Sequence, residues 1–339
     1  MSTQQATGTA VSAPILRKRE SLWGDAFRRL IRNRGAMFGG VIILLLFLTY
    51  IFADVIAIKP YDVQVPTENN NVPQWLVSVF PMIKGYARIN EAYPLGADDL
   101  GRDLFSRIVY GTRVSLTVAL VGPIIALLIG VVYGSISGFF GGRVDNLMMR
   151  LVDVMYAFPS LLLIILMMAF FRSSFAKAAE PGTLKYMLND LDSKVGGMLF
   201  IFVGIGITAW MGMARLTRGQ VLSLREKEFV EAARSIGAGD LRIMFRHILP
   251  NILGPLIVAE TLAIPGYIST ETFLSFIGLG VNPPTPSWGA MIADGARTIR
   301  TYPNQAIFPA LALAIVMFAF NFLGDGLRDA LDPRMRGTQ

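Results

Sequence analysis

Six apolar stretches, each about as long as a bilayer is thick, most constrain what this chain can fold into. A helix needs about 20 mainly apolar residues to cross the hydrocarbon core of a membrane. Because backbone polar groups must be satisfied within the bilayer, each stretch is predicted to be a helix. The stretches are residues 36–58, 114–139, 154–171, 195–214, 252–279 and 306–323. The chain is therefore predicted to be an all-α integral membrane protein with six transmembrane helices, a multi-pass protein of the cell membrane.

The composition agrees with this prediction and excludes several function classes. Hydrophobic residues make up 53% of the chain and charged residues only 16%, whereas soluble domains carry about 25% charged residues. The net charge of +7 comes without a basic-aromatic stripe or zinc-finger spacing, so nucleic acid is not expected as a partner. The absence of cysteine excludes disulfides and thiolate chemistry, and one histidine, His247, cannot form a multi-histidine metal site.

Lysine and arginine positions predict the orientation and the domain organisation. Basic residues are more numerous in the tails and inner loops, most densely at Arg28, Arg29, Arg32 and Arg34 before the first span, so both termini are predicted to be cytoplasmic. The predicted parts are a cytoplasmic tail 1–35, a first transmembrane helix 36–58, an extracytoplasmic segment 59–113, a core transmembrane domain 114–323 with a cytoplasmic loop 215–251, and a cytoplasmic tail 324–339.

The loop between the fourth and fifth stretches has a distinctive pattern. It reads Glu-Ala-Ala-Arg-Ser-Ile-Gly over residues 231–237 and His-Ile-Leu-Pro over residues 247–250. Good helix formers precede a glycine break at Gly237, and Pro250 is predicted to stop the second segment. The small side chains of Ala232 and Ala233 would allow the backbone of a partner protein to approach this face of the helix closely. Such an element, held between spans, suits contact with a soluble partner.

At these residues the chain resembles the permease subunits of ATP-binding-cassette (ABC) importers, whose cytoplasmic loop carries an "EAA" motif at this spacing. His247 stands where the general pattern has Ile. The resemblance implies a type I ABC importer permease fold with cytoplasmic termini, and a loop seated in a cleft of an ATPase subunit. The implied coupling residues are Glu231, Ala232, Ala233, Arg234, Ser235, Gly237, Ile248, Leu249 and Pro250.

Residues 94–116 and 274–289 sharpen the resemblance to the dipeptide, oligopeptide and nickel importers, specifically to the second of their two permease subunits. Residues 322–334 close the chain in the same family manner. The extracytoplasmic motif comprises Gly96, Asp98, Asp99, Gly101, Arg102 and Asp103. We interpret it as a capped turn in which Asp98 or Asp99 caps a helix and Arg102 pairs with a carboxylate. A structural lid and direct contact with a substrate-binding protein both remain possible roles.

Two patterns inside the spans suggest function or packing. Glu260 and Glu271 are eleven residues apart, so a regular helix places both on one face about 16 Å apart. Charges in a span are costly and usually face a cavity or a partner, which motivates the hypothesis that this face lines the translocation path; the alternative is a salt bridge to a partner permease. Gly130, Gly134, Gly138 and Gly142 form a small-residue groove, predicted to pack against a helix rather than to line a channel.

The chain has no visible means of hydrolysing ATP. A P-loop needs Gly-Lys-Ser/Thr, and no lysine here is followed by serine or threonine. It is therefore predicted to be a non-enzymatic subunit with no cofactor of its own, ATP and magnesium belonging to partners. The resemblance implies a homologous second permease, two ABC ATPase subunits and an extracytoplasmic substrate-binding protein. Peptides are the preferred substrate, nickel chelates or other small solutes the alternative. An ion-coupled secondary transporter or a membrane-embedded enzyme are rival classes.

Overall fold

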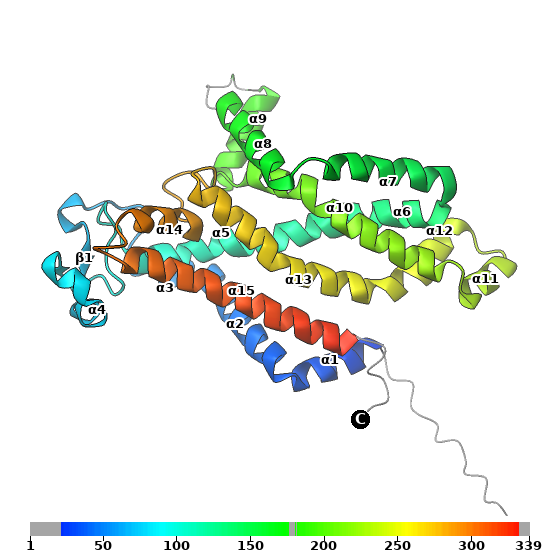
Figure 1. The fold of residues 1–339 in the computed structure, drawn as a ribbon, viewed down its shortest axis with the longest axis horizontal. Helices are drawn as coiled ribbons and strands as arrows, with labels where there is room; N and C mark the ends of the chain where they lie inside the picture. The colour runs from blue at the N-terminus through cyan, green and yellow to red at the C-terminus, as the bar shows by residue number, and fades with distance from the viewer. Residues whose placement is uncertain (1–21, 176–179, 181, 332–339) are drawn as a thin grey trace, which may run out of the picture.

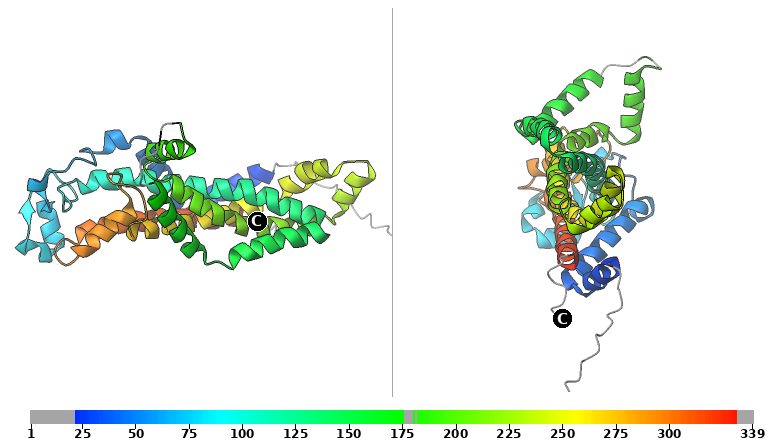
Figure 2. Two further views of the ribbon diagram at one scale, coloured as in Figure 1. Left: turned by 90° about the horizontal axis from the view of Figure 1, so that it is seen from above. Right: turned by 90° about the vertical axis from the view of Figure 1, so that its right-hand side faces the viewer.

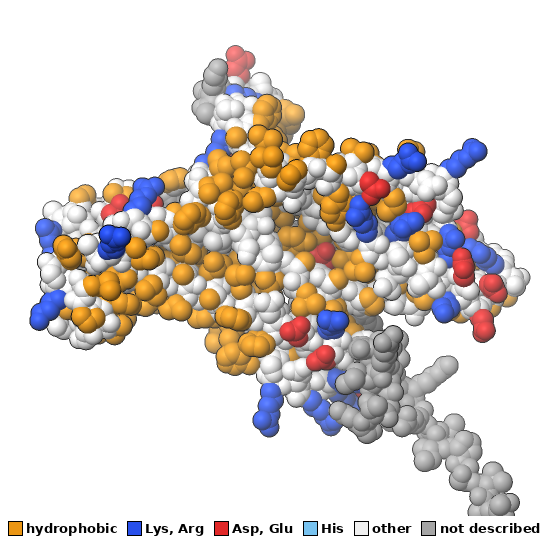
Figure 3. Space-filling model, viewed as in Figure 1, with side chains coloured by type: hydrophobic (Ala, Val, Ile, Leu, Met, Phe, Trp, Pro, Cys, Tyr) orange, Lys and Arg blue, Asp and Glu red, His pale blue; other side chains and the backbone are white. Residues whose placement is uncertain are grey.

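The long helices lie side by side in an elongated bundle (Figure 1, Figure 2). This computed structural model describes residues 22–175, 180 and 182–331. Within those residues, five helices are long and apolar enough to span a membrane, or up to six if one bent pair counts as a span. On the face drawn in Figure 3, apolar side chains cover much of the middle of the bundle, while charged side chains gather towards its ends. The predicted all-α membrane fold is confirmed. Much of the tails 1–35 and 324–339 lies outside the described residues.

The first two helices of the chain pack against the last helix, α15 (Asn304–Leu331). The short helix α1 (Leu22–Arg32) is followed by α2 (Arg34–Ile51) and by the one-turn helix α3 (Ala53–Ile56). Asn33 caps α2, because its side-chain oxygen accepts a hydrogen bond from the Ala36 amide. The predicted span 36–58 is helical as far as Ile56, with a break at Phe52 between α2 and α3.

A small ordered layer covers one end of the bundle. Its elements are η1 (Pro66–Glu68), β1 (Asn71–Val72), α4 (Gln74–Val79), η2 (Pro81–Gly85) and β2 (Arg88–Ile89). The two strands pair in parallel. Val72, Leu76 and Ile83 form the buried core of this layer.

The second span begins well before the predicted residue 114. It comprises α5 (Leu104–Ile125), a π-helical turn η3 (Ala126–Val131) and α6 (Val132–Phe140). Hydropathy misses the first turns because they contain Arg107 and Arg113. The structure satisfies both: Arg113 pairs with Asp54 at 2.8 Å, and Arg107 lies 3.6 Å from Asp98.

The third predicted span is bent rather than straight. The predicted residues 154–171 cover only the end of α7 (Gly142–Tyr156) and most of α8 (Ser160–Phe175), and these two helices meet at an angle of 73°. Pro159 explains the break, since proline lacks an N–H donor and disfavours the helical conformation of the residue before it. α8 and the following α9 (Leu184–Lys194) project sideways from the bundle (Figure 1, Figure 2).

The fourth and fifth spans continue beyond their predicted cytoplasmic ends. α10 (Leu199–Leu224) leads to α11 (Glu228–Ser235), and then α12 (Asp240–Ile243), a π-helical turn η4 (Met244–Ile248) and α13 (Leu249–Phe276) form one long helix. The prediction that Pro250 stops a helix is wrong. Pro250 sits in the first turn of α13, directly after the π-helical turn, where the regular hydrogen-bond pattern is already shifted.

The chain returns through α14 (Trp288–Arg297) and α15 (Asn304–Leu331). Gly130 in η3, together with Gly134 and Gly138 in α6, faces α10, where an added Cβ would lie 2.3–2.9 Å from backbone carbonyl oxygens of α10. The packing interpretation of these three is confirmed. Gly142 differs: it begins α7 with φ of +53°, and an added Cβ would meet nothing within 4 Å.

Candidate coupling and translocation sites

The helix α11 carries the Glu-Ala-Ala sequence and lies at one end of the bundle, away from the layer formed by residues 59–103 (Figure 1). Two inward-facing residues attach it: Val230 and Ala233, three apart, are both buried. They pack in a hydrophobic cluster with Phe139, Ile243 and Ile248. The cluster joins α11 to the ends of α6 and of the long α12–α13 helix.

Ala233 therefore does not lie on a surface that a partner could approach. It is only 4% exposed, because the helical period that exposes Ala232 turns Ala233 towards the core. Ile248 is buried in the same cluster, whereas Leu249 is partly buried and Pro250 is exposed. Ile248, rather than His247, is thus the apolar residue that anchors the end of the loop.

The exposed part of α11 combines charged residues, small residues and the large apolar side chains of Phe229, which is 40% exposed, and of Ile236 just after the helix. Glu231, Ala232, Arg234 and Ser235 are exposed, and Ile236 is 86% exposed at the end of the helix. Gly237 follows with φ of +84°, a conformation that L side chains rarely adopt, so a sharp turn needs glycine there. The predicted turn at Gly237 is confirmed. Together with the exposed Phe229, Leu241 and Phe245 side chains, Ile236 gives the loop an apolar surface suited to contact with another protein.

Polar contacts tie this end of the bundle together. Arg225 donates a hydrogen bond to the Gly138 carbonyl at 3.1 Å, and the Arg234 guanidinium lies 5.9 Å from the centre of the Phe139 ring. Asp145 of α7 accepts two hydrogen bonds from Arg218 of α10, at 2.5 and 2.6 Å. These contacts connect α11 to α6 and connect α7 to α10, so a displacement of α11 would act on neighbouring helices of the bundle.

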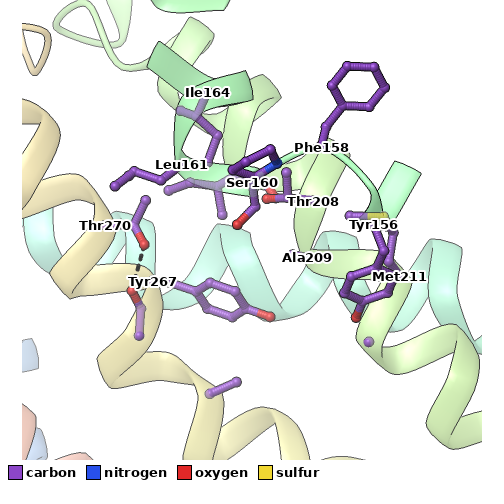
Figure 4. Close-up of a pocket in the computed structure, with 15 residues that line it drawn as sticks. Tyr156, Phe158, Ser160, Leu161, Ile164, Thr208, Ala209, Met211, Tyr267 and Thr270 are labelled. Carbon is purple, nitrogen blue, oxygen red and sulfur yellow. Dashed lines mark hydrogen bonds between the residues drawn. The ribbon is translucent and has the colours of Figure 1, made fainter. Parts of the chain in front are cut away.

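A cavity of about 490 Å³ lies at mid-length of the bundle, where α7 bends into α8. Figure 4 shows side chains from α7, α8, α10 and α13 turned towards it. Its lining includes five residues that carry hydroxyl groups: Tyr156, Ser160, Thr208, Tyr267 and Thr270. The other lining residues are Phe158, Pro159, Leu161, Ile164, Ile205, Ala209, Met211, Gly212, Ala263 and Gly266. None of these described lining residues carries a charge.

Glu260 and Glu271, on α13, have different surroundings. Glu260 is one helical turn from the lining residue Ala263, and its Oε2 accepts a hydrogen bond from the Tyr267 hydroxyl at 3.0 Å. Glu271 is fully buried, and its Oε1 accepts hydrogen bonds from Ser275 at 2.7 Å and Ser287 at 2.9 Å. Glu260 thus adjoins the cavity, whereas Glu271 connects α13 to the start of α14. The hypothesis that both line the path stays a prediction.

The Gly96–Asp103 motif lies at the opposite end of the bundle from α11 and forms the joint between the end layer and α5. Asp98 accepts hydrogen bonds from the Leu100 and Arg102 amides and pairs with the Arg102 guanidinium at 2.7 Å. The helix cap is Asp103, rather than Asp98 or Asp99, since its Oδ2 accepts from the Ser106 amide at 2.8 Å. Burial raises the pKa of the Asp103 carboxyl above its ordinary value.

The two glycines of this motif have positive φ angles. An added Cβ at Gly101 would lie 1.9 Å from the Val65 carbonyl oxygen, and one at Gly96 would lie 2.6 Å from the Asn304 side chain. Asp99 is exposed, whereas Asp98, Arg102 and Asp103 are buried. The buried members therefore hold the joint together, and Asp99 is the charged member available to another protein.

Sequence reasoning missed the cavity and its hydroxyl groups. These residues come from four helices and are far apart along the chain, so no local spacing connects them. Pro159 within an apolar stretch was one available signal, because a proline inside a span kinks or breaks the helix. Sequence reasoning also missed two ion pairs between α7 and α10. Asp145 pairs with Arg218, and Asp153 pairs with Arg215.

Comparison with known proteins agrees with this geometry. Residues 130–337 match the family described as the binding-protein-dependent transport system inner membrane component, and residues 21–73 match the N-terminal TM domain of oligopeptide transport permease C. The oligopeptide transport system permease protein OppC of Bacillus subtilis (strain 168) is 40% identical over 322 residues, covering 95% of this chain and 93% of that protein. The dipeptide transport system permease protein DppC of the same organism is 39% identical over 313 residues, covering 92% and 86%.

A solved structure supports the fold. A chain of the inward-facing MetNI methionine ABC transporter aligns with a TM-score of 0.51 at 17% identity, covering 67% of this chain and 96% of that chain. The fold and the exposed loop helix define a multi-pass membrane permease of the ABC importer class. This chain belongs to the family of inner-membrane components of binding-protein-dependent transport systems. In that family, ATP hydrolysis is carried out by partner ATPase subunits, and the permease also works with a substrate-binding protein.

Proposed function

We propose that this chain forms half of the translocation path of an ATP-driven peptide importer. Its relatives are named for oligopeptide and dipeptide transport, and the similarity extends over nearly the whole chain. A homologous second permease would supply the other half of the path, two ABC ATPases would bind ATP and magnesium, and an extracytoplasmic protein would deliver the peptide. Nickel chelates or other small solutes are the alternative substrates.

The observation that carries this proposal is the exposed face of α11 at one end of the bundle. In the proposed orientation that end is cytoplasmic, as are both termini, and residues 59–103 face the outside. α1 and the last turns of α15 lie towards the same end of the bundle as α11 (Figure 1). This placement supports a position of both chain ends and of α11 on the same side of the membrane. An ATPase that binds Glu231, Ala232, Ser235 and Ile236 would displace α11. That displacement would be transmitted through the hydrophobic cluster around Val230 to the membrane-spanning helices.

Site-specific cross-linking tests the coupling role cleanly, because the natural chain contains no cysteine. Ala232→Cys places a thiol on the exposed face and Ala233→Cys places one in the core, one residue apart on the same helix. In the assembled transporter, Ala232→Cys is expected to cross-link to an ATPase subunit and Ala233→Cys is not. Capture by Ala233→Cys alone, or labelling of Ala232→Cys only from outside the cell, would contradict the proposal.

Substrate class needs a separate measurement. The complete transporter in proteoliposomes, supplied with its binding protein and ATP, is expected to accumulate a labelled tripeptide. Accumulation of a nickel chelate with no peptide uptake would favour the alternative.

A further inference from the structure

The described groups around Glu260 leave its carboxylate without a basic partner. It is 5% exposed, near mid-length of a membrane-spanning helix, and its hydrogen bond comes from the neutral Tyr267 phenol. Among residues 22–175, 180 and 182–331, it forms no ion pair within 4.0 Å. A carboxylate inside a bilayer normally has a charged partner or faces a water-filled path, because an unpaired buried charge is costly. The missing partner can therefore be a ligand.

Glu260 shares a helical face with the cavity. Ala263, Tyr267 and Thr270 line the cavity, and Glu260 precedes them at the same helical spacing, so it extends their face by one turn. Tyr267 connects the two features, since its ring belongs to the cavity lining while its hydroxyl donates to Glu260. A cation in the cavity would thus meet the phenol first and the carboxylate next.

The basic side chain that stacks on a cavity-lining ring already has an acidic partner. The Arg215 guanidinium lies 4.1 Å from the centre of the Tyr156 ring, and the same arginine pairs with Asp153 at 2.5 Å. The remaining polar lining consists of hydroxyl groups, which can accept or donate hydrogen bonds without selecting a side-chain charge. Glu260 is therefore the group at this site that distinguishes a cation from a neutral or anionic group.

We propose that Glu260 binds the α-ammonium group of a peptide during its passage, displacing the Tyr267 hydroxyl from the carboxylate. This inference rests on the proposed peptide transport. An α-amino group has a pKa of about 7.7–8.0, so most of it is protonated at neutral pH. The hydroxyl groups of the cavity would meet the peptide backbone, which all peptides share. The site would then recognise the peptide terminus rather than the side chains.

The test measures uptake by the complete transporter in proteoliposomes, with its binding protein and ATP. Two peptides of the same sequence, one with a free amino terminus and one N-acetylated, are compared after correction for their measured affinities for the binding protein. Glu260→Gln is expected to lower kcat/KM for the free-amine peptide about tenfold and to leave the acetylated peptide unchanged, since a charge-assisted hydrogen bond contributes about that factor. Glu260→Asp should restore part of the preference.

Matched variants separate recognition from structure. Glu271→Gln changes the other buried carboxyl of the same helix, which bonds Ser275 and Ser287 and is not among the cavity-lining residues. Total uptake can fall in this variant, but the ratio between the two peptides should not change if Glu260 recognises the terminus. Tyr267→Phe removes the competing hydroxyl but keeps the ring, and it should raise the preference for the free amine. The Tyr267→Phe result tests the proposal even if Glu260→Gln does not fold.

Three results would overturn the proposal. An unchanged ratio in both Glu260→Gln and Tyr267→Phe would exclude a role for this carboxylate in terminus recognition. Dependence on a lysine side chain in the peptide, with no effect of acetylation, would assign the carboxylate to side-chain cations instead. Failure of the wild-type transporter to move any peptide would refute the proposed function itself and this inference with it, a result distinguishable from the other two.

Discussion

Replacement of Gly134 by alanine should separate α6 from α10. An added Cβ would lie 2.3 Å from the Ala214 carbonyl oxygen and 2.8 Å from Thr217 Cβ. Because one of the obstructing atoms belongs to a backbone in the middle of a long helix, the two helices must move apart by about 1 Å to restore ordinary contact. Overpacking of this kind costs up to about 3 kcal/mol, and the gain in helix propensity returns about 1 kcal/mol. The net loss is about 2 kcal/mol.

Thermal unfolding of the purified transporter in detergent measures this loss. A net change of about 2 kcal/mol should lower the melting temperature by about 3 °C, since the unfolding entropy of a 339-residue chain is about 0.7 kcal/mol/K. Gly219→Ala on α10 is the matched control, because an added Cβ there meets nothing within 4 Å. That control should melt at or slightly above the wild-type temperature. If Gly134→Ala is as stable as Gly219→Ala, close backbone approach does not hold these helices together.

Substitutions at three other sites test the ends of the bundle and the polar contact between α7 and α10. Asp103→Ala should cost about 1 kcal/mol through loss of the α5 cap, whereas Asp103→Asn keeps a capping oxygen. Because the pKa of Asp103 is raised in the folded state, the folded protein binds more protons at this site than the unfolded protein does. The free energy of unfolding should therefore fall as pH rises from about 4 through the raised pKa. Asp103→Asn should remove that fall, and denaturation at several pH values measures it. Asp145→Ala leaves Arg218 partly buried without its bidentate partner, and we expect a loss of about 2 kcal/mol in thermal unfolding and a recovery when Arg218 is also replaced by methionine. Ile236→Asp should leave the unfolding free energy within about 0.5 kcal/mol of wild type, since the side chain is exposed, but should abolish ATPase stimulation by the loaded binding protein; normal stimulation would refute a coupling role for this face.

Apolar length located the membrane-spanning regions well but misplaced their ends. α10 continues to Leu224, past the predicted limit at residue 214, and α15 continues to Leu331 rather than ending near residue 323. In both cases the helix persists where the sequence becomes polar, because hydrogen bonding along the backbone does not depend on side-chain hydropathy. Hydropathy thus reports the apolar part of a helix, and tertiary contacts decide where the helix ends.

The loop motif was predicted more accurately in spacing than in orientation. The helix 228–235 and the turn at Gly237 follow from residue types, and the structure has both. Which alanine faces inward depends on the cluster around Phe139 and Ile248, whose members come from other helices. The cavity has the same property, since it exists only where four helices converge. The local sequence pattern therefore predicts the helices and turns, but which side of each helix is buried depends on the tertiary structure.

The unbroken course of α12, η4 and α13 has a mechanical consequence. Residues Asp240–Phe276 make one helix of 37 residues, which at 1.5 Å per residue is about 55 Å long. A tilt of about 5° about one end would carry the other end through about 5 Å, roughly the width of an extended chain in a sheet. Small angular changes imposed beside Gly239 can thus widen or narrow a distant opening without any helix having to unwind.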